Sequence, residues 1–530
     1  MPAYRRVVRR GNQLHDRLPR QRGVASTWWT VLGGLLAVGA LIALADDTPL
    51  GGQPPVDQAP SLTVAVGQEL SAEEAEGAIP IVVTGNVQAM LQWCACETGT
   101  GFLAAKRATV IRQERGGAIL LDAGEAFSGD SDLDRQRGET QLRIMESLGY
   151  DAALLGPDAF ALGTDFATGT LLQSKVIWAC ANLVLDGRPR PAWGCIREFA
   201  GRKVALIALV SEALWIEEPR TTAGVTMEDP LEAYSAVVKR ERPDVAIAYG
   251  RLSEADARRL SACERAPEAV FTSTKALRER LGMMGRVYNA PDDPNSGYVE
   301  YPNTRGVLGA TAVYFTDVLG PSGLISVRLG RRSQGYWHLQ ATGRTHDDPA
   351  TKSATDGFFA QVRDTARQDS EKYAKSAWKD ELAAGRRFVG AQACRECHEP
   401  EWTQWSGTKH ANAYAAVTKS DRWFYPACVA CHSTGLGHAS GFEIDDAPMT
   451  PLALYPGGLQ PGQVVNSPLG LEGVQCEACH GPGSRHVGAP SSKSTIDRTP
   501  ATGLCVECHD EKNSPGFAGT SQEYRERVAH

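Results

Sequence analysis

Four short segments in the last quarter of the chain share the pattern Cys-x-x-Cys-His: Cys394–His398, Cys428–His432, Cys476–His480 and Cys505–His509. The two thiols of such a unit can form thioethers with the two vinyl groups of one porphyrin, and the adjoining histidine can bind the iron axially. Zinc sites and small disulfides also use closely spaced cysteines, but zinc has no need for a histidine directly after each second cysteine. The pattern therefore predicts four covalently attached c-type haems, held by Cys394, Cys397, Cys428, Cys431, Cys476, Cys479, Cys505 and Cys508.

The histidines of this region set the class of chemistry. The four units supply four proximal iron ligands, His398, His432, His480 and His509. Four more histidines follow the first unit and are candidate distal ligands: His410, His438, His486 and His530. If all four bind iron, every haem is saturated and limited to electron transfer. If some are surface histidines instead, an iron stays open to small ligands.

Five cysteines remain outside the haem units: Cys94, Cys96, Cys180, Cys195 and Cys263. In an oxidising compartment Cys180 and Cys195 could form a disulfide, and the alternative is that both are small buried thiols. A redox or metal role for Cys94 and Cys96 is a further alternative, although two soft ligands rarely suffice for a metal.

The first 45 residues have the composition of a signal peptide or an N-terminal membrane anchor. Arginines crowd the start of the chain, and the stretch from Gly23 to Ala45 carries no charge and is about long enough to span a bilayer. Ala43-Leu44-Ala45 resembles a cleavage site for signal peptidase. We expect either a chain anchored at the periplasmic side of the cytoplasmic membrane or, after cleavage, a periplasmic or extracellular protein.

Composition divides the remaining chain into four parts. Residues 46–78 are rich in Pro, Gly and Gln and are expected to be a flexible linker. Residues 79–342 alternate short apolar runs with helical stretches, which predicts an α/β domain whose strands include IPIVVT, AILLDA, AALLG, KVIWA, KVALIALV, DVAIAY, EAVFT, AVYFTDV, GLISVRLG and WHLQATG. Residues 343–387 are expected to form a linker and a helix, and residues 388–530 a mainly α, loop-rich haem domain.

The haem domain resembles the cytochrome c-554 family of tetrahaem electron carriers. The resemblance rests on FVGAQACRECHEPEWTQWSGTKHANAYAAV, CVACHSTGLGHASGF, GVQCEACHGPGSRHV and LCVECHDEKNSPGF. It implies that His410 and His486 are distal ligands to haems other than those of their own neighbouring units. It also implies that the haem of Cys428–His432 is five-coordinate. The presence of His438, a candidate distal ligand, conflicts with that coordination in this chain.

Residues 79–342 resemble the catalytic domain of 5′-nucleotidases, a branch of the calcineurin-like metallophosphoesterases. The matching stretches are VVTGNVQAMLQWCAC, AAKRATVIRQERGGAILLDAGEAFSG, IMESLGYDAALLGPDAFALG, VALIALV and DVAIAYG. The resemblance implies a four-layer αββα sandwich with a two-metal site at the strand ends.

The residues that hold metals in that family are replaced in this chain. The corresponding positions carry Asn86-Val87-Gln88, Glu125, Gly156-Pro157-Asp158-Ala159, Tyr249-Gly250 and Ser273-Thr274-Lys275-Ala276. There is also no histidine from Asp16 to Trp337, whereas a hydrolytic metal pair normally needs several nitrogen ligands. We therefore expect this domain to be inactive as a hydrolase and to serve as a scaffold or docking module.

These features favour an electron-transfer protein with four haem c groups. One alternative is a multihaem oxidoreductase that acts on a small nitrogen compound at a five-coordinate haem, and a second is a residual metal-dependent phosphohydrolase. The formal net charge of -7 gives no reason to expect nucleic acid. Acidic side chains outnumber basic ones in residues 391–530, so a redox partner protein with a basic docking face is expected.

Overall fold

The structure is a computed structural model, and all of its described residues lie in one compact unit, Ser61–His530. The structure describes residues 66–68, 70, 75–92, 103–216, 224–272, 305–308, 310–316, 323–331, 333–341, 345–369, 385–419, 421–444, 470–492, 495–497 and 503–509. Several sequence predictions lie outside these residues. They concern the signal or anchor segment 1–45, the Cys94 and Cys96 pair, the stretch from Ser273 to Ala276, and His530.

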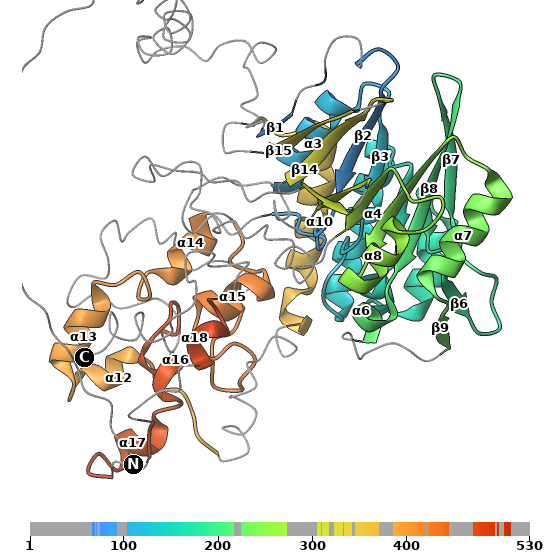
Figure 1. Cartoon of the computed structure of the whole chain (residues 1–530). Helices are drawn as coiled ribbons and strands as arrows, with labels where there is room; N and C mark the ends of the chain where they lie inside the picture. Colours follow the sequence, from blue (N-terminus) through green and yellow to red (C-terminus); the bar gives the residue numbers. More distant parts are fainter. Residues whose placement is uncertain are drawn as a thin grey trace, which may run out of the picture. The chain divides into compact units, whose positions relative to one another are not determined.

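The first sheet of the α/β domain has seven strands in the order β1-β15-β14-β2-β3-β4-β5 (Figure 1). Strands β2 to β5 run parallel, while β14, β15 and β1 are joined to them by antiparallel pairing. The strands are β1 (Val66–Gln68), β2 (Ile79–Thr84), β3 (Ile119–Asp122), β4 (Ala152–Leu154), β5 (Ile177–Ala179), β14 (Gly323–Leu329) and β15 (Gln334–Gln340).

The second sheet has six strands in the order β12-β13-β11-β10-β8-β7. Its centre is parallel, and antiparallel strands close both edges. The strands are β7 (Gly194–Phe199), β8 (Arg202–Val210), β10 (Val245–Arg251), β11 (Ala269–Thr272), β12 (Arg305–Leu308) and β13 (Thr311–Phe315). Strands β6 (Leu183–Leu185) and β9 (Val225–Met227) form a separate two-stranded sheet.

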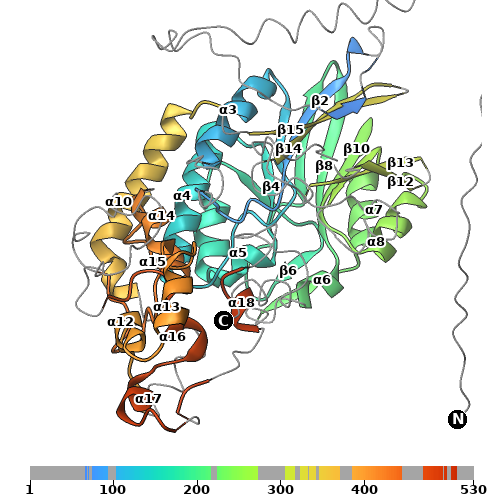
Figure 2. The same cartoon turned by 90° about the vertical axis from the view of Figure 1, so that its left-hand side faces the viewer.

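Helices cover the outer faces of the two sheets. Helices α3 (Leu103–Arg115) and α4 (Asp132–Leu148) lie on the first sheet, while α7 (Pro230–Glu241) and α8 (Glu254–Ser261) lie on the second (Figures 1 and 2). One apolar cluster includes side chains from both sheets, such as Val83 and Tyr249, and a second cluster joins the six-stranded sheet to α7 and α8. The domain is therefore layered helix, sheet, sheet, helix, as the resemblance implies.

Local signals explain where the principal helices begin and end. The hydroxyl of Ser131 accepts a hydrogen bond from the Asp134 N–H, and the Asp134 carboxylate accepts one in return from the Ser131 N–H. This capping box starts α4, which ends at Gly149 in the left-handed conformation that glycine adopts without a steric penalty. Shorter helical elements are α5 (Pro157–Ala161), α6 (Glu212–Ile216), the π-helix Phe166–Thr170 and the 3₁₀-helix Leu171–Gln173.

Each predicted strand of this domain is present, because the short apolar runs are buried on both faces. The structure differs from the expected boundary at the start of the domain. Strand β1 pairs with β15 although it lies within the stretch 46–78, whose composition predicts a linker. Cys180 and Cys195 are separate buried thiols, so the predicted alternative of a disulfide is wrong.

The segment after the α/β domain contains helix α10 (Pro349–Asp369), which packs against α3 and α4. Asp348 anchors its start, since its carboxylate accepts hydrogen bonds from the Thr351 N–H and from the Arg112 side chain at 2.9 and 2.6 Å. This helix lies within residues 343–387, where a linker and a helix are expected. It extends the helical layer over the first sheet.

The C-terminal region contains short helices joined by turns. These are α12 (Ala391–Arg395), α13 (Glu399–Ser406), α14 (Ala413–Lys419), α15 (Pro426–His432), α16 (Cys476–His480), α17 (Ser484–Gly488) and α18 (Gly503–Val506). Among the residues described here, the only β pairing is the isolated bridge between Ser433 and Glu472. The region is thus helical and rich in loops, as predicted.

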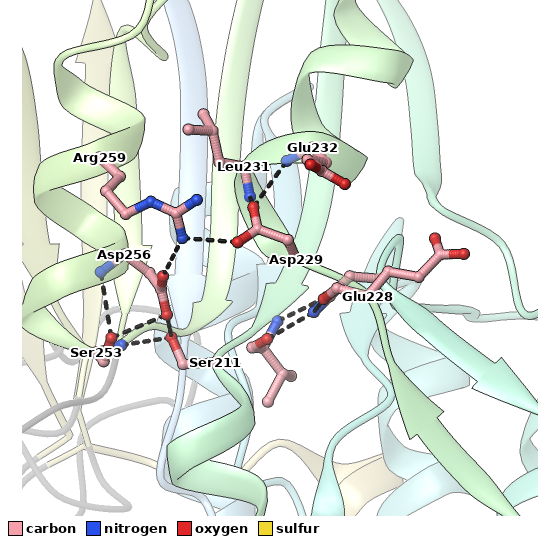
Figure 3. A network of polar contacts seen from close by, with 10 residues as sticks. Ser211, Glu228, Asp229, Leu231, Glu232, Ser253, Asp256 and Arg259 are labelled. Atoms are coloured by element: carbon pink, nitrogen blue, oxygen red, sulfur yellow. Dashed lines mark hydrogen bonds and ion pairs between the residues drawn. The ribbon is translucent and has the colours of Figure 1, made fainter.

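A polar network fixes the loops at one end of the second sheet (Figure 3). Asp256 accepts hydrogen bonds from Ser211 at 2.6 Å and from Ser253 at 2.9 Å, so it joins the end of β8 to the start of α8. Arg259 donates to Asp256 at 3.1 Å and to Asp229 at 2.7 Å. The other carboxylate oxygen of Asp229 accepts the Leu231 and Glu232 N–H groups and caps α7. The two helix starts are therefore held together.

The cap on α7 gives a testable stability difference. Asp229→Ala removes the acceptor for two otherwise unsatisfied N–H groups and should lower the free energy of unfolding by about 1–2 kcal/mol in urea denaturation. Asp229→Asn keeps a capping oxygen and loses only a partly exposed ion pair with Arg259, so its effect should be below about 1 kcal/mol. Equal losses for the two variants would show that the ion pair, rather than the cap, provides the stability.

Candidate haem centres and the strand-end site

Each Cys-x-x-Cys-His unit folds as approximately one helical turn. The second and third units lie in α15 and α16, the first begins in α12, and the fourth begins in α18. The backbone N–H of His398 donates to the Cys394 carbonyl at 2.9 Å, and that of His509 donates to the Cys505 carbonyl at 2.8 Å. In such a turn, residues three positions apart share a face. The two thiols of each unit are thus placed side by side, as attachment to one porphyrin requires.

The tautomers of two proximal histidines suit an iron ligand. Nδ1 of His432 lies 2.6 Å from the carbonyl oxygen of Ala413, and Nδ1 of His480 lies 2.6 Å from that of Asp497. A carbonyl oxygen can only accept, so each Nδ1 carries the proton and each Nε2 keeps its lone pair. Metal-binding histidines commonly show this arrangement. Burial also lowers the pKa of His432, which favours the neutral ring.

Two pairs of imidazoles from different units face one another. The ring centroids of His398 and His486 are 6.2 Å apart, and those of His410 and His509 are 6.0 Å apart. Two imidazoles that bind one metal from opposite sides, each through a bond of about 2 Å, have centroids roughly 6 Å apart. Both pairs therefore fit the dimensions of one bis-histidine iron.

His438 lies in a different environment. Its Nδ1 accepts a hydrogen bond from the Ser440 N–H at 3.1 Å, and its ring packs edge-on against Phe388 with centroids 5.0 Å apart. An Nδ1 that accepts leaves the proton of a neutral imidazole on Nε2. That tautomer is opposite to the one His432 and His480 adopt. The bond to Nδ1 therefore makes His438 a weaker candidate for an iron ligand than His432 and His480, although its Nε2 is also buried.

The units also touch in pairs. The side chains of Cys394, in the first unit, and Cys476, in the third, lie close enough to interact. The Gln475 side chain accepts the Ala391 N–H at 2.7 Å, which further ties the first unit to the third. The thiol of Cys431 lies 3.9 Å from the Glu507 carbonyl oxygen, so the second unit contacts the fourth.

Glu477 is a buried carboxylate inside the third unit. It accepts hydrogen bonds from the N–H groups of Val389, Gly390 and Gly483 at 3.0, 2.8 and 2.7 Å. Burial raises the pKa of Glu477, and these N–H bonds oppose that rise. Three backbone donors stabilise the ionised form. Glu477 therefore holds the start of the haem region against the loop that follows α16.

The strand-end positions of the α/β domain come together as the fold predicts. Asn86 and Gln88 follow β2, Glu125 follows β3 and Asp158 follows β4. Asn86, Gln88 and Glu125 all have positive φ, which is uncommon for residues with side chains. The backbone N–H of Gln88 donates to the Glu125 carbonyl at 2.7 Å. The loop shape of a strand-end site is thus present.

A guanidinium group lies among these acidic side chains. Arg251, at the end of β10, has Nη2 3.4 Å from Oε1 of Glu125, and it also acts electrostatically on Asp158. The described residues contain no group of three or more His, Cys, Asp or Glu side chains that could hold a metal ion. The sequence does not single out Arg251 as a residue of this site. It directly follows Tyr249-Gly250, one of the replaced metal-binding positions, and a lone arginine there does not indicate a function.

Two buried carboxyl groups near this site resist ionisation. Burial raises the pKa of Asp158 to about 7, while the Phe127 N–H, which donates at 3.1 Å, and Arg251 oppose the rise. Burial likewise raises the pKa of Asp122 to about 7 against a 2.7 Å hydrogen bond from Thr84. Both groups exchange protons near neutral pH.

The raised pKa of Asp158 predicts a pH dependence of stability. The folded protein keeps a proton that the unfolded chain releases from about pH 4 upward, so Asp158 reduces stability progressively between about pH 4 and pH 7. Asp158→Asn removes this titration. Its free energy of unfolding relative to the unaltered protein should rise across that window, by up to roughly 4 kcal/mol.

The matched control for this prediction is Asp165→Asn. Asp165 is exposed, and Arg135 lowers its pKa, so its replacement should give little change and no gain with rising pH. A constant difference between Asp158→Asn and the unaltered protein from pH 4 to 7 would contradict the raised pKa.

Comparisons with known proteins locate both resemblances. Residues 393–451 match the family described as cytochrome c554 and c-prime. The chain is 30% identical over 117 residues to cytochrome c-554 of Nitrosomonas europaea, covering 19% of this chain and 41% of the relative. It is also 30% identical over 163 residues to a 5′-nucleotidase of Vibrio cholerae, covering 27% of this chain and 29% of the relative. The matches span less than half the length of either relative.

Among solved structures, a calcineurin-like phosphoesterase from Bacillus subtilis matches 54% of this chain and 97% of its own, with a TM-score of 0.41 and 16% identity. No helix in the described part of the chain is long and apolar enough to cross a membrane. The chain joins an N-terminal region similar to 5′-nucleotidases to a C-terminal region that matches the cytochrome c-554 family.

Proposed function

We propose that the protein is an extracytoplasmic tetrahaem cytochrome that transfers electrons, with the phosphoesterase-like domain as a scaffold or docking module. The observation that carries this proposal is the opposition of imidazoles from different units, His398 with His486 and His410 with His509, at 6.2 and 6.0 Å. The tautomers of His432 and His480 support it independently, because they leave Nε2 able to bind iron.

The residues have separate roles in this proposal. The paired cysteines of each unit hold a haem c by thioethers, and His398, His432, His480 and His509 bind the irons from the proximal side. His486 supplies the distal ligand at the first unit and His410 at the fourth. The bound haem supplies reversible one-electron chemistry. Histidine at both axial positions, without a methionine sulfur, favours low to moderate reduction potentials.

The contacts between units suggest an order for electron transfer. The third unit touches the first through Cys476 and Cys394, and the segment after the first unit provides His410 to the fourth. The fourth unit in turn touches the second through Glu507 and Cys431. We infer a relay in the order third, first, fourth, second. It could run in either direction, according to the potentials.

The phosphoesterase-like domain is proposed to be inactive as a hydrolase. Arg251 places a positive charge beside Glu125, where a metal ion would have to displace it.

The setting of the protein is part of the proposal. Haem attachment and the export signal favour a periplasmic location, with membrane attachment through residues 1–45 if that segment is retained. The acidic haem region favours a redox partner with a basic docking face.

The environment of His438 favours a second candidate function. If His438 is a core histidine, it does not serve as the distal ligand of the second unit. An open iron there would suit an oxidoreductase that acts on a small nitrogen compound, such as nitric oxide, nitrite or hydroxylamine. In both functions the other units carry electrons.

Exchange of the candidate distal ligands tests the proposal. His486→Ala should open one iron per chain, which is measured as an added equivalent of carbon monoxide bound by the reduced protein and as loss of one low-spin signal. The matched change His438→Ala should leave both measurements as they are in the unaltered protein, because His438 has the tautomer unsuited to iron.

The two variants separate the alternatives. An added carbon monoxide equivalent for His438→Ala would make His438 a distal ligand and remove the second candidate function. No change for His486→Ala, at full haem content, would contradict the crossed ligation proposed for the first unit.

A further inference from the structure

The segment from Asp421 to Tyr425, which leads into α15, packs on helix α10. Tyr425 is buried and contacts two rings of that helix, with centroids 5.2 Å from Phe359 and 6.2 Å from Phe358. Helix α10 itself packs on α3 and α4 of the phosphoesterase-like domain. That domain thus contributes to the environment of the second haem unit.

Arg422 is the charged residue at this contact. Its guanidinium lies over the ring of Phe359, 3.6 Å from the centroid, and its Nη1 donates to the Asp421 carbonyl at 2.6 Å. The residue is only 6% exposed, and burial lowers its pKa. Arginine nevertheless keeps its charge, because its ordinary pKa is so high. The structure therefore contains a buried positive charge six residues before Cys428.

Among the other charges near this contact, Arg137 and Asp134 of α4 form a mostly buried ion pair at 2.9 Å whose charges offset each other, and the remaining pairs are exposed. Asp421 pairs with Arg363 at 2.8 Å, with 63% and 46% of their side chains exposed. Asp356 pairs with Lys352 at 2.6 Å, with 47% and 40% exposed. Solvent screens such pairs strongly, whereas it screens a buried charge much less. The positive charge of Arg422 should therefore dominate the local field.

This field reaches the attachment site of the second haem. The Cys428 N–H donates to the Tyr425 carbonyl at 2.9 Å, and the Tyr425 N–H donates to the Arg422 carbonyl at 3.0 Å, so successive tight turns connect Arg422 to the attachment site. Burial raises the pKa of the Cys428 thiol to about 11, and Arg422 opposes that rise.

We propose that Arg422, held in a dry position by α10, raises the reduction potential of the haem of the second unit. Reduction adds one electron and lowers the positive charge at the iron, so a nearby buried cation stabilises the reduced form. Arg422 does not bind iron and acts as a tuning residue. The inference rests on the proposed function only in that the second unit carries a haem. It gives the fused domain a role in setting one potential of the relay.

The test is a spectroelectrochemical titration of the full-length protein with its haems attached. Arg422→Gln should shift one of the four reduction steps to lower potential and leave the other three in place. Arg422→Lys retains the charge and should keep that step close to its original position. His432→Met identifies the step of the second haem, because exchange of its axial ligand moves that step by itself.

The haem content of each variant separates this inference from the proposed function. Four haems per chain with no displaced step in Arg422→Gln would overturn the tuning role and leave the tetrahaem assignment intact. Equal shifts of all four steps would also overturn it, since they would report a general change in charge. If Arg422→Gln does not load its haems, the variants Arg422→Lys and Phe359→Leu test the tuning role of Arg422 instead. Phe359→Leu loosens the contact but keeps the charge of Arg422. The inference would be contradicted if Arg422→Lys, with a full haem load, shifted the reduction step of the second haem away from its original potential. It would also be contradicted if that step did not shift in Phe359→Leu.

Discussion

In the proposed function, the arrangement of the haem region depends on how each iron obtains its axial ligands. A Cys-x-x-Cys-His turn supplies a ligand on one side only, so any second imidazole comes from elsewhere in the chain. His486 meets His398 across units, and His410 meets His509. In the proposed function this crossed ligation would tie together short helices that also share a buried apolar cluster. Glu477 and Gln475 add buried hydrogen bonds at the same junctions.

The phosphoesterase-like domain combines two layered sheets with strand-end loops in which Asn86, Gln88 and Glu125 adopt positive φ. Arg251 places a positive charge 3.4 Å from Glu125 at these strand ends. The contact of α10 with the segment before α15 gives the domain a physical connection to the second haem unit.

The sequence predicts the strands and the haem units of this protein well, but it does not predict which distant side chains come into contact. Apolar runs such as KVALIALV and DVAIAY became the central strands β8 and β10, because a strand buried on both faces must be continuously apolar. The haem units can also be recognised from the sequence, because each is a pattern of five consecutive residues. Which histidines face one another depends on the fold of distant segments. The distinction between His438 and His486 rests on one N–H group, that of Ser440, which has no signature in the sequence. Arg251 and Arg422 likewise gain their importance only from their neighbours in space.

The central claim is that two irons are each held between imidazoles from different haem units. Low-temperature EPR and near-infrared magnetic circular dichroism of the oxidised full-length protein, normalised to its haem content, test it most directly. The account predicts four haems per chain, with at least two low-spin irons that show bis-histidine ligation. Four haems that are all high-spin, or low-spin irons without bis-histidine signatures, would contradict it.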